Sequence, residues 1–349
     1  MIKYLGSKRT LVPLLSRILE KSQASTASDL FTGTTRVARG FKQAGAFVTA
    51  VDTASYAHVF AKTFIELDAS TLPVDELVEA IARLNALKGK HGYFTETYCV
   101  TSRYFQPANG ERVDAIRDLI ESDYRDTWLY EPLIAALILA TDKVDSTTGM
   151  QMAYLKTWSK RSYNEIKLLV PDLLNGEGLA VQADALDAVR QIPEVQLAYL
   201  DPPYNQHRYF ANYHIWETVV RWDEPSTYGI ANKRLDVRTK DHRSAFNSKP
   251  AMPVALRELV AEVKAETVVL SYNNESWLSR DELLDICSVK GHVEIIDVDF
   301  KRYVGSQIGV YNKAGERVGE PGAKRNTEHV VIAGEKSMVQ RLMQALPKE

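Results

Sequence analysis

The chain has 349 residues, of which 45% are hydrophobic, so it can form one large domain with an insertion or two domains. It shows neither an apolar run long enough to span a bilayer nor a basic leader followed by an apolar stretch, so we predict a cytoplasmic protein without membrane spans. A formal net charge of -2 and a pI near 6.4 exclude a general attraction to phosphates, so any nucleic-acid contact requires local basic groups.

The first predicted elements form a β-α-β unit. A short strand at Ser28–Leu30 runs into a loop of small residues that ends at Thr35, and a helix is predicted from Arg36 to Ala44. The second strand, Phe47–Val51, ends at Asp52. Ligands of such units bind beyond the carboxyl ends of the strands, where an acid at the end of the second strand commonly holds a ribose. The loop lacks the G-x-G-x-x-G pattern, which disfavours a dinucleotide and therefore a nicotinamide-dependent dehydrogenase.

A long, mostly helical stretch separates Asp52 from the next predicted strand, Leu179–Gln182. Helical patterns occupy Val74–Leu87, Arg112–Ser122 and Tyr130–Lys143. Because a crossover between parallel strands needs only a dozen or more residues, the excess predicts an inserted, mainly helical subdomain. We place this subdomain at residues 72–170 and the catalytic domain at residues 1–71 and 171–349.

Two basic groups along the chain are candidate phosphate contacts. One surrounds Trp158 and includes Lys156, Lys160 and Arg161; the other includes Lys233, Arg234 and Arg238. A solvated surface explains either group equally well when it is taken alone. The two cysteines and seven histidines show no metal-ligand spacing, so we predict reduced thiols and no metal site.

The tetrapeptide Asp201-Pro202-Pro203-Tyr204 follows the predicted buried strand Val195–Leu200. An exocyclic amine on a nucleobase is a poor nucleophile, and its two N–H groups must be drawn toward acceptors before the nitrogen can attack. The carboxylate of Asp201 and the carbonyl of Pro202 supply two acceptors, while consecutive prolines fix φ and remove competing N–H donors. Tyr204 offers a flat face for a flipped base, with Tyr209 or Tyr213 shaping the space around it. A plain turn after a buried strand is the alternative.

The remaining predicted strands lie in the C-terminal half. Thr267–Ser271 has the pattern of a buried strand, and His292–Phe300 with His329–Ala333 read as an antiparallel pair. The connection between the last two, at about residues 304–327, is too long for a compact hairpin loop and is a candidate for contact with DNA.

These motifs together resemble the Dam-like, alpha-group N6-adenine DNA methyltransferases over most of the chain. The resemblance implies a Rossmann-like methyltransferase sheet that ends in an antiparallel hairpin, with target recognition in the inserted helical region. It also implies that Asp201, Pro202, Pro203 and Tyr204 form the catalytic motif. The residues that it assigns to S-adenosylmethionine are Tyr4, Gly6, Lys8, Asp29, Phe31, Gly33, Asp52 and Asp184. The chain departs from the family at Thr35, where a second glycine is usual and a side chain could crowd the methionine moiety.

The sequence therefore predicts a site-specific enzyme that transfers a methyl group from S-adenosylmethionine to adenine N6 in double-stranded DNA. A restriction-modification or phage-defence setting, with a cognate restriction endonuclease as partner, follows from the same resemblance. Two alternatives stay open: a methyltransferase acting on an RNA base amine, and a DNA-binding modification subunit with a weak catalytic pocket.

Overall fold

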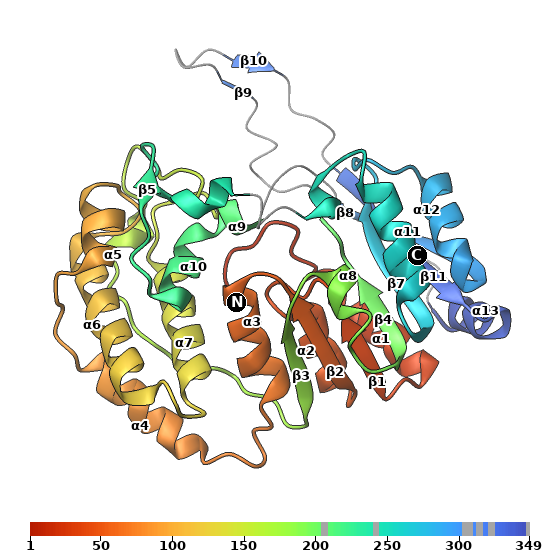
Figure 1. The fold of residues 1–349 in the computed structure, drawn as a ribbon, viewed down its shortest axis with the longest axis horizontal. Helices are drawn as coiled ribbons and strands as arrows, with labels where there is room; N and C mark the ends of the chain where they lie inside the picture. The colour runs from red at the N-terminus through yellow and green to blue at the C-terminus, as the bar shows by residue number, and fades with distance from the viewer. Residues whose placement is uncertain (204–208, 240–243, 302–309, 312–316, 320–324, 347–349) are drawn as a thin grey trace.

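The computed structural model describes residues 1–203, 209–239, 244–301, 310–311, 317–319 and 325–346. It contains a seven-stranded mixed sheet with helices on both faces (Figure 1). The strands of this sheet are β1 (Thr26–Asp29), β2 (Phe47–Asp52), β3 (Gly178–Gln182), β4 (Val195–Leu200), β7 (Ala265–Asn273), β8 (His292–Lys301) and β11 (Arg325–Gly334). The predicted α/β class is confirmed.

The strand order in the sheet is β3-β2-β1-β4-β7-β11-β8. The first five strands in this order are parallel, and β11 inserts antiparallel between β7 and β8, with His329 opposite both Tyr272 and Asp297. The predicted C-terminal antiparallel pair is thus confirmed, and both of its strands are longer than expected. The sheet order steps outward from β1 in both directions, so the carboxyl ends of β1 and β4 lie side by side, as ligand sites in open parallel sheets require.

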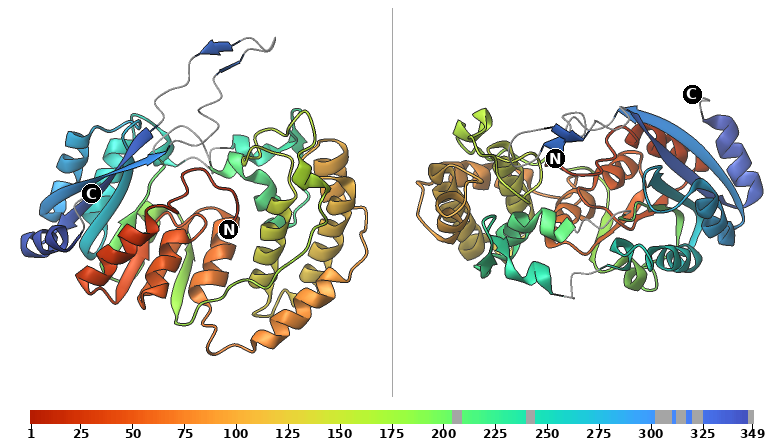
Figure 2. Two further views of the ribbon diagram at one scale, coloured as in Figure 1. Left: turned by 180° about the vertical axis from the view of Figure 1, so that it is seen from behind. Right: turned by 90° about the horizontal axis from the view of Figure 1, so that it is seen from above.

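Alternation along the strands divides the core into two layers. Val269, Val330 and Ile332 face one layer, whereas Leu270 and Val331 face the other. The first layer is covered by α1 (Val12–Ser22), α2 (Arg36–Gln43), α3 (Ser55–Ala61) and α13 (Lys336–Ala345). The second is covered by α8 (Ala185–Ala188), α11 (Met252–Glu262) and α12 (Arg280–Cys287). Figure 2 shows these two sets of helices on opposite sides of the sheet.

A group of helices lies beside the sheet and is called the helical lobe below (Figure 1). It contains α4 (Val74–Asn85), α5 (Tyr93–Thr95), α6 (Pro107–Tyr124), α7 (Tyr130–Lys143), α10 (His214–Arg221) and the short pair β5 (Thr227–Tyr228) and β6 (Lys233–Arg234). The three predicted helices correspond to α4, α6 and α7. The lobe shares its apolar core with the first layer of the sheet, and α10 joins it from beyond the predicted insertion. The boundaries 72–170 stay a prediction.

The other described elements are short. Helix α9 (Tyr209–Asn212) precedes α10, and β9 (Val310–Tyr311) pairs with β10 (Arg317–Gly319) within the long connection predicted from the sequence. Tyr204 and much of that connection lie outside the described residues. Single π-helical turns extend α3 at Lys62–Glu66 and α5 at Glu96–Val100.

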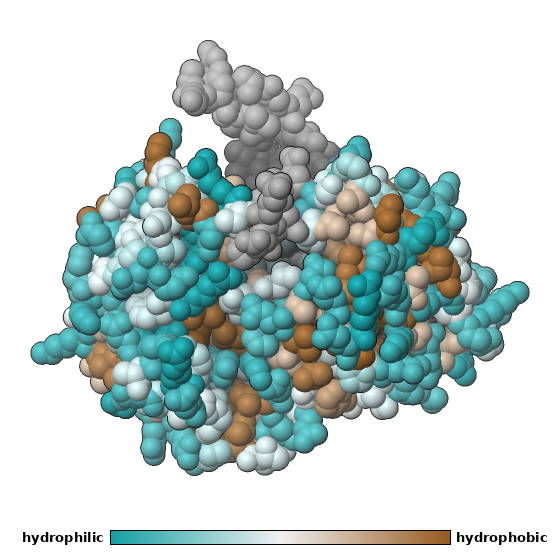
Figure 3. Space-filling model, in the orientation of Figure 1, coloured by the Kyte–Doolittle hydropathy of each residue, from teal (hydrophilic) through white to brown (hydrophobic). Residues whose placement is uncertain are grey.

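The face of the molecule drawn in Figure 3 is mainly hydrophilic, with apolar residues in small separate groups. Across the described ranges, none of the helices combines the length and the apolar character needed to cross a bilayer.

Candidate active site

A cavity of about 640 Å³ opens at the carboxyl ends of β1 to β4. Its size lies in the range of small-molecule sites. Residues from both halves of the chain line it: Tyr4, Gly6, Leu30, Phe31, Asp52, Thr53, Ala54, Gln182, Ala183, Asp184, Ala185, Asp187, Asp201, Pro203, Tyr209, Phe210, Ser244 and Asn247. Predicted cofactor and catalytic residues therefore meet in one cavity, although their motifs are far apart in the sequence.

Asp52 holds together the two turns at one end of this cavity. Its Oδ2 accepts a hydrogen bond from the Gly33 amide at 2.8 Å, and its Oδ1 accepts one from Ala54 at 3.0 Å. Burial raises the pKa of Asp52, while these backbone hydrogen bonds act in the opposite direction. A carboxylate has about four lone-pair sites, so Asp52 retains acceptor capacity for a ligand hydroxyl.

Gly33 is fixed by its backbone and by a neighbouring ring. Its φ is +49°, and a Cβ at this position would lie 3.0 Å from the hydroxyl oxygen of Tyr4. Thr35, where the family usually has glycine, has a φ of 62°, which explains why glycine suits that position. The Thr35 hydroxyl donates to the carbonyl of Thr34 at 2.7 Å. Thr35 is 0% exposed and is absent from the cavity lining, and its effect on a bound cofactor stays a prediction.

Tyr4 covers the cavity as part of a stack of three tyrosines. Its ring centroid lies 5.2 Å from that of Tyr209 and 4.9 Å from that of Tyr213, with nearly parallel planes. The Leu5 amide donates to the Tyr213 hydroxyl at 2.7 Å. Tyr209 lines the cavity, but Tyr213 is 1% exposed and lies behind Tyr4. Of the two tyrosines predicted to shape the base site, only Tyr209 is placed to do so.

Asp201 lies directly after β4 and pairs with a lysine from the N-terminal segment. Lys8 Nζ is 2.9 Å from Asp201 Oδ1 and 2.6 Å from Glu328 Oε1 on β11. Lys8 is thus placed between two carboxylates and is itself 8% exposed. The pKa of Asp201 is raised to about 6, mainly by burial, with Lys8 acting to lower it and the charge of Glu328 acting to raise it. Asp201 is therefore ionised at neutral pH and able to accept hydrogen bonds.

Asp29 ends β1 next to this motif. It is 1% exposed and accepts a long hydrogen bond from the Phe31 amide at 3.4 Å. Burial, followed by the charge of Asp201, raises the pKa of Asp29 to about 7. Because burial and the charge of Asp201 disfavour ionisation of Asp29, a cationic ligand near both residues would stabilise the ionised form of Asp29.

Another part of the cavity lining, after β3, combines an acid with an aromatic side chain. Asp184 caps α8 by accepting from the Leu186 amide at 2.9 Å, and burial raises the pKa of Asp184. The rings of Phe31 and Phe246 meet edge to face with centroids 5.1 Å apart. An apolar wall beside a carboxylate suits a planar heterocycle with an exocyclic amine.

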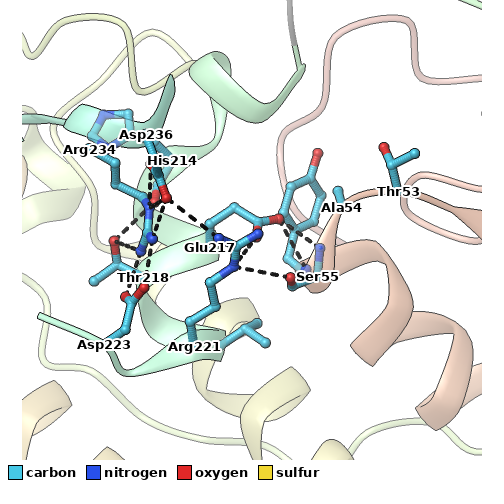
Figure 4. Close-up of polar contacts among 12 residues, drawn as sticks. Thr53, Ala54, Ser55, His214, Glu217, Thr218, Arg221, Asp223, Arg234 and Asp236 are labelled. Carbon is cyan, nitrogen blue, oxygen red and sulfur yellow. Dashed lines mark hydrogen bonds and ion pairs between the residues drawn. The ribbon is translucent and has the colours of Figure 1, made fainter. Parts of the chain in front are cut away.

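Some cations of the two predicted basic groups are accessible to solvent, whereas others form ion pairs within the protein. Lys156, Lys160 and Arg238 are exposed, and Lys233 is partly exposed. Arg161 forms an ion pair with Asp145 at 2.5 Å, and Arg234, 1% exposed, is bound by Asp223 and Asp236 (Figure 4). Arg234 is thus a structural cation in this conformation, and phosphate contact by Arg234 is incompatible with its burial.

Several residues in or next to the cavity could not be predicted from the sequence: Asn247 and Gln182 line it, whereas Glu328 and Phe246 lie behind lining residues. Glu328 lies in the last strand, and the sequence shows it simply as a charged residue that directly precedes the predicted apolar strand His329–Ala333. Phe246 and Asn247 follow a basic segment with no motif of their own. Gln182 is the last residue of the predicted strand before Asp184. In a parallel sheet this is the end of the strand at which ligands bind, so the sheet topology alone could have identified Gln182.

Comparison with known proteins identifies the family. The profile described as D12 class N6 adenine-specific DNA methyltransferase matches residues 4–286, which include every residue that lines the cavity.

The chain belongs to this family. It is 31% identical over 331 residues to Modification methylase StsI of Streptococcus sanguinis, covering 88% of this chain and 50% of that protein. It is 30% identical over 318 residues to Type II methyltransferase M.NlaIII of Neisseria lactamica, covering 86% and 92%. Type II methyltransferase M.FokI of Planomicrobium okeanokoites is 28% identical over 325 residues, which cover 86% of this chain and 50% of M.FokI. The chain thus spans about half the length of StsI and M.FokI and most of M.NlaIII.

Family membership agrees with the donor chemistry of the cavity. Within the described ranges, no cluster of three or more His, Cys, Asp or Glu side chains is arranged to hold a metal ion. The carboxylates of the cavity instead accept backbone amides or pair with Lys8, and a methyl donor of the S-adenosylmethionine type is what the family implies.

Proposed function

We propose that this chain transfers the methyl group of S-adenosylmethionine to N6 of adenine in double-stranded DNA. The observation that carries the proposal is the position of Asp201, an ionised acceptor that lines the same cavity as Asp52 and Asp184. A cofactor-binding acid and an amine-binding acid must share one cavity if a donor and a base are to react directly.

The chain's own residues fit the methyl donor. Asp52 has acceptor capacity for ribose hydroxyls, Asp184 and Phe31 lie where a purine ring and its amine would be held, and Tyr4 with Gly6 covers the cavity. Asp29 and Gly33 lie next to lining residues of the same wall, and Lys8 pairs with Asp201 on the base side of the cavity. S-adenosylmethionine supplies an electrophilic methyl group on a sulfonium.

The base side of the site requires two acceptors and a flat surface. In our proposal the Asp201 carboxylate and the Pro202 carbonyl accept the two N–H groups of the amine, which helps the nitrogen to pyramidalise. Pro203 lines the cavity and keeps this turn rigid. Tyr204, the proposed stacking residue, lies outside the described residues, while Tyr209 contributes an aromatic wall.

Binding of duplex DNA is proposed to involve the helical lobe and the accessible cations Lys156, Lys160, Lys233 and Arg238. These cations compensate locally for the overall charge of -2. Residues 72–170 are proposed to read the target sequence. A cytoplasmic setting with a cognate restriction endonuclease is proposed from the Type II names of the relatives.

The decisive experiment is long-read sequencing of DNA from a methylation-free bacterial host that expresses the intact chain. We expect N6-methyladenine within one sequence motif, and none in a strain expressing Asp201→Ala. Asp285→Ala is the matched control, because Asp285 is a surface aspartate of α12 that pairs with Arg257, outside both the cavity and residues 72–170. It should leave methylation unchanged.

Two negative outcomes have different meanings. A chain that binds S-adenosylmethionine but leaves adenine unmodified would contradict the DNA assignment and favour an RNA amine. A folded chain that fails to bind S-adenosylmethionine would favour a modification subunit without catalytic activity.

A further inference from the structure

Glu217 on α10 is a buried carboxylate that reaches from the helical lobe to the turn after β2 (Figure 4). It is 0% exposed, and its Oε1 accepts from the Ser55 amide at 2.8 Å and more weakly from the Tyr56 amide at 3.5 Å. These are the first amides of α3, which have no partner within their own helix. Ala54, at the N-cap position, has no side chain that could satisfy them, so a residue from a distant helix supplies the cap.

The turn that Glu217 holds is one wall of the cavity. Thr53 and Ala54 line the cavity directly, and the Ala54 amide donates to Asp52 at 3.0 Å. Gln182, another lining residue, donates to the Thr53 carbonyl and to the Ser55 hydroxyl, each at 3.1 Å. The turn is therefore fixed by Asp52 and Gln182 at the sheet and by Glu217 from the lobe.

Arg221, one turn further along α10, balances the buried charge. Its Nε lies 3.2 Å from Glu217 Oε2 and donates to the Ser55 hydroxyl at 3.3 Å. Burial raises the pKa of Glu217, and Arg221 lowers it. Arg221 also approaches Asp236 at 3.5 Å, which extends the network into the lobe. A paired carboxylate that also satisfies helix amides can be retained in a core.

We propose that Glu217 is a positioning residue for the methyl donor, acting by fixing the Thr53–Ser55 turn beside Asp52. This inference rests on the proposed function, because it takes the cavity as the site of S-adenosylmethionine. Glu217 contacts the turn and Arg221 but does not line the cavity, so its effect is on donor affinity rather than on the transfer step. The affinity of the sheet for its donor then depends on how α10 is packed in the lobe.

The test compares Glu217 with a carboxylate of the same kind that has no link to the cavity. Asp114 on α6 is 2% exposed and accepts from the amides of Phe94 and Thr95 at the start of α5. Glu217→Ala and Asp114→Ala each remove a buried helix cap, so both should lower the melting temperature. Calorimetric titration with S-adenosylmethionine should show a dissociation constant raised roughly tenfold for Glu217→Ala, as expected for a lost hydrogen bond to a charged group. The constant for Asp114→Ala should be unchanged.

Glu217→Gln keeps one acceptor oxygen for the Ser55 amide. This variant allows the same titration if Glu217→Ala does not fold. It should bind the donor with an affinity between those of the wild type and Glu217→Ala. In methylation assays the KM for S-adenosylmethionine should rise for Glu217→Gln, while kcat at saturating donor stays near the wild-type value.

Wild-type donor affinity in both Glu217 variants would overturn the inference, as would an equal loss of affinity in Asp114→Ala. The proposed function would survive either result, because the wild type binds the donor in each case. Absence of binding by the wild type itself would overturn both.

Discussion

The sheet edge and the helical lobe each bury a cation between two carboxylates, Lys8 at the edge and Arg234 in the lobe, but the edge adds a further buried carboxylate, Asp29. At the edge, Asp29 and Asp201 lie near each other, and each has a raised pKa. In the lobe, Arg234 is bound by Asp223 at 2.6 Å and by Asp236 at 2.7 Å. Burial alone would lower the pKa of Arg234, but these two carboxylates raise it. The excess of buried carboxylates beside Lys8 suits a site that a cationic ligand completes, whereas the paired charges around Arg234 stabilise the fold itself.

The largest effect should come from removing the charge of Asp201. Asp201→Asn exchanges an ionised acceptor for a neutral amide, which should lower kcat by roughly 10²–10³-fold in a methyl-transfer assay on DNA. Chemical denaturation should show no loss of stability, because the variant also removes a buried charge. Activity within a few-fold of the wild type would show that the charge of Asp201 is not needed for methyl transfer.

Arg234 should behave in the opposite way. Arg234→Met leaves Asp223 and Asp236 without their shared cation, so the free energy of unfolding in urea should fall by about 3 kcal/mol. Arg190→Met is the control, since Arg190 pairs with Glu258 and Glu262 at the exposed surface and should matter little. If both variants unfold at the same urea concentration, the buried ion pairs of Arg234 contribute no more to stability than the exposed pairs of Arg190.

The pH dependence of kcat tests whether Asp201 must be ionised for turnover. Its carboxylate must be ionised to accept the amine, and its pKa is about 6. With saturating donor and DNA, kcat should be flat above that pH and fall about tenfold for each pH unit below it. Circular dichroism at the same pH values shows whether the fold persists. A flat profile down to pH 5 would mean that another group limits the reaction.

Asp29→Asn gives the smallest predicted effect and tests the stability cost of the like charges. The pKa of Asp29 rises from 3.8 to about 7, so the native state binds more protons than the unfolded state between these values. Stability of the wild type is therefore lost as the pH rises through this window. The stability of the variant relative to the wild type should therefore increase as the pH rises from 4 to 8, with the difference vanishing near pH 4. A constant difference at all pH values would contradict the raised pKa.

The sequence predicts most of the sheet because its strands are buried runs that end in chemically distinctive residues. Asp52 and Asp201 each follow such a run, and parallel strands bring their carboxyl ends to one edge. The helices α4, α6 and α7 were predicted from their periodicity in the same way. These features depend on local spacing, which a single sequence contains.

What could not be predicted depends on contacts between distant segments. Arg234 reads as a surface cation because its partners, Asp223 and Asp236, look like ordinary charged neighbours in the sequence. Tyr213 shares its segment with Tyr209, yet one is buried behind Tyr4 and the other lines the cavity. Glu217 has no motif at all, and its role follows only from packing of α10 against the turn after β2.

The insertion of β11 between β7 and β8 has a consequence for how the site is assembled during synthesis. Lys8 leaves the ribosome early, but its partner Glu328 lies on β11, which is made after every other strand of the main sheet. A nascent chain that already contains both the cofactor loop and Asp201 therefore still lacks one carboxylate of this trio. The active site is completed only when the last strand joins the sheet, so a growing chain should stay inactive on nearby DNA until then.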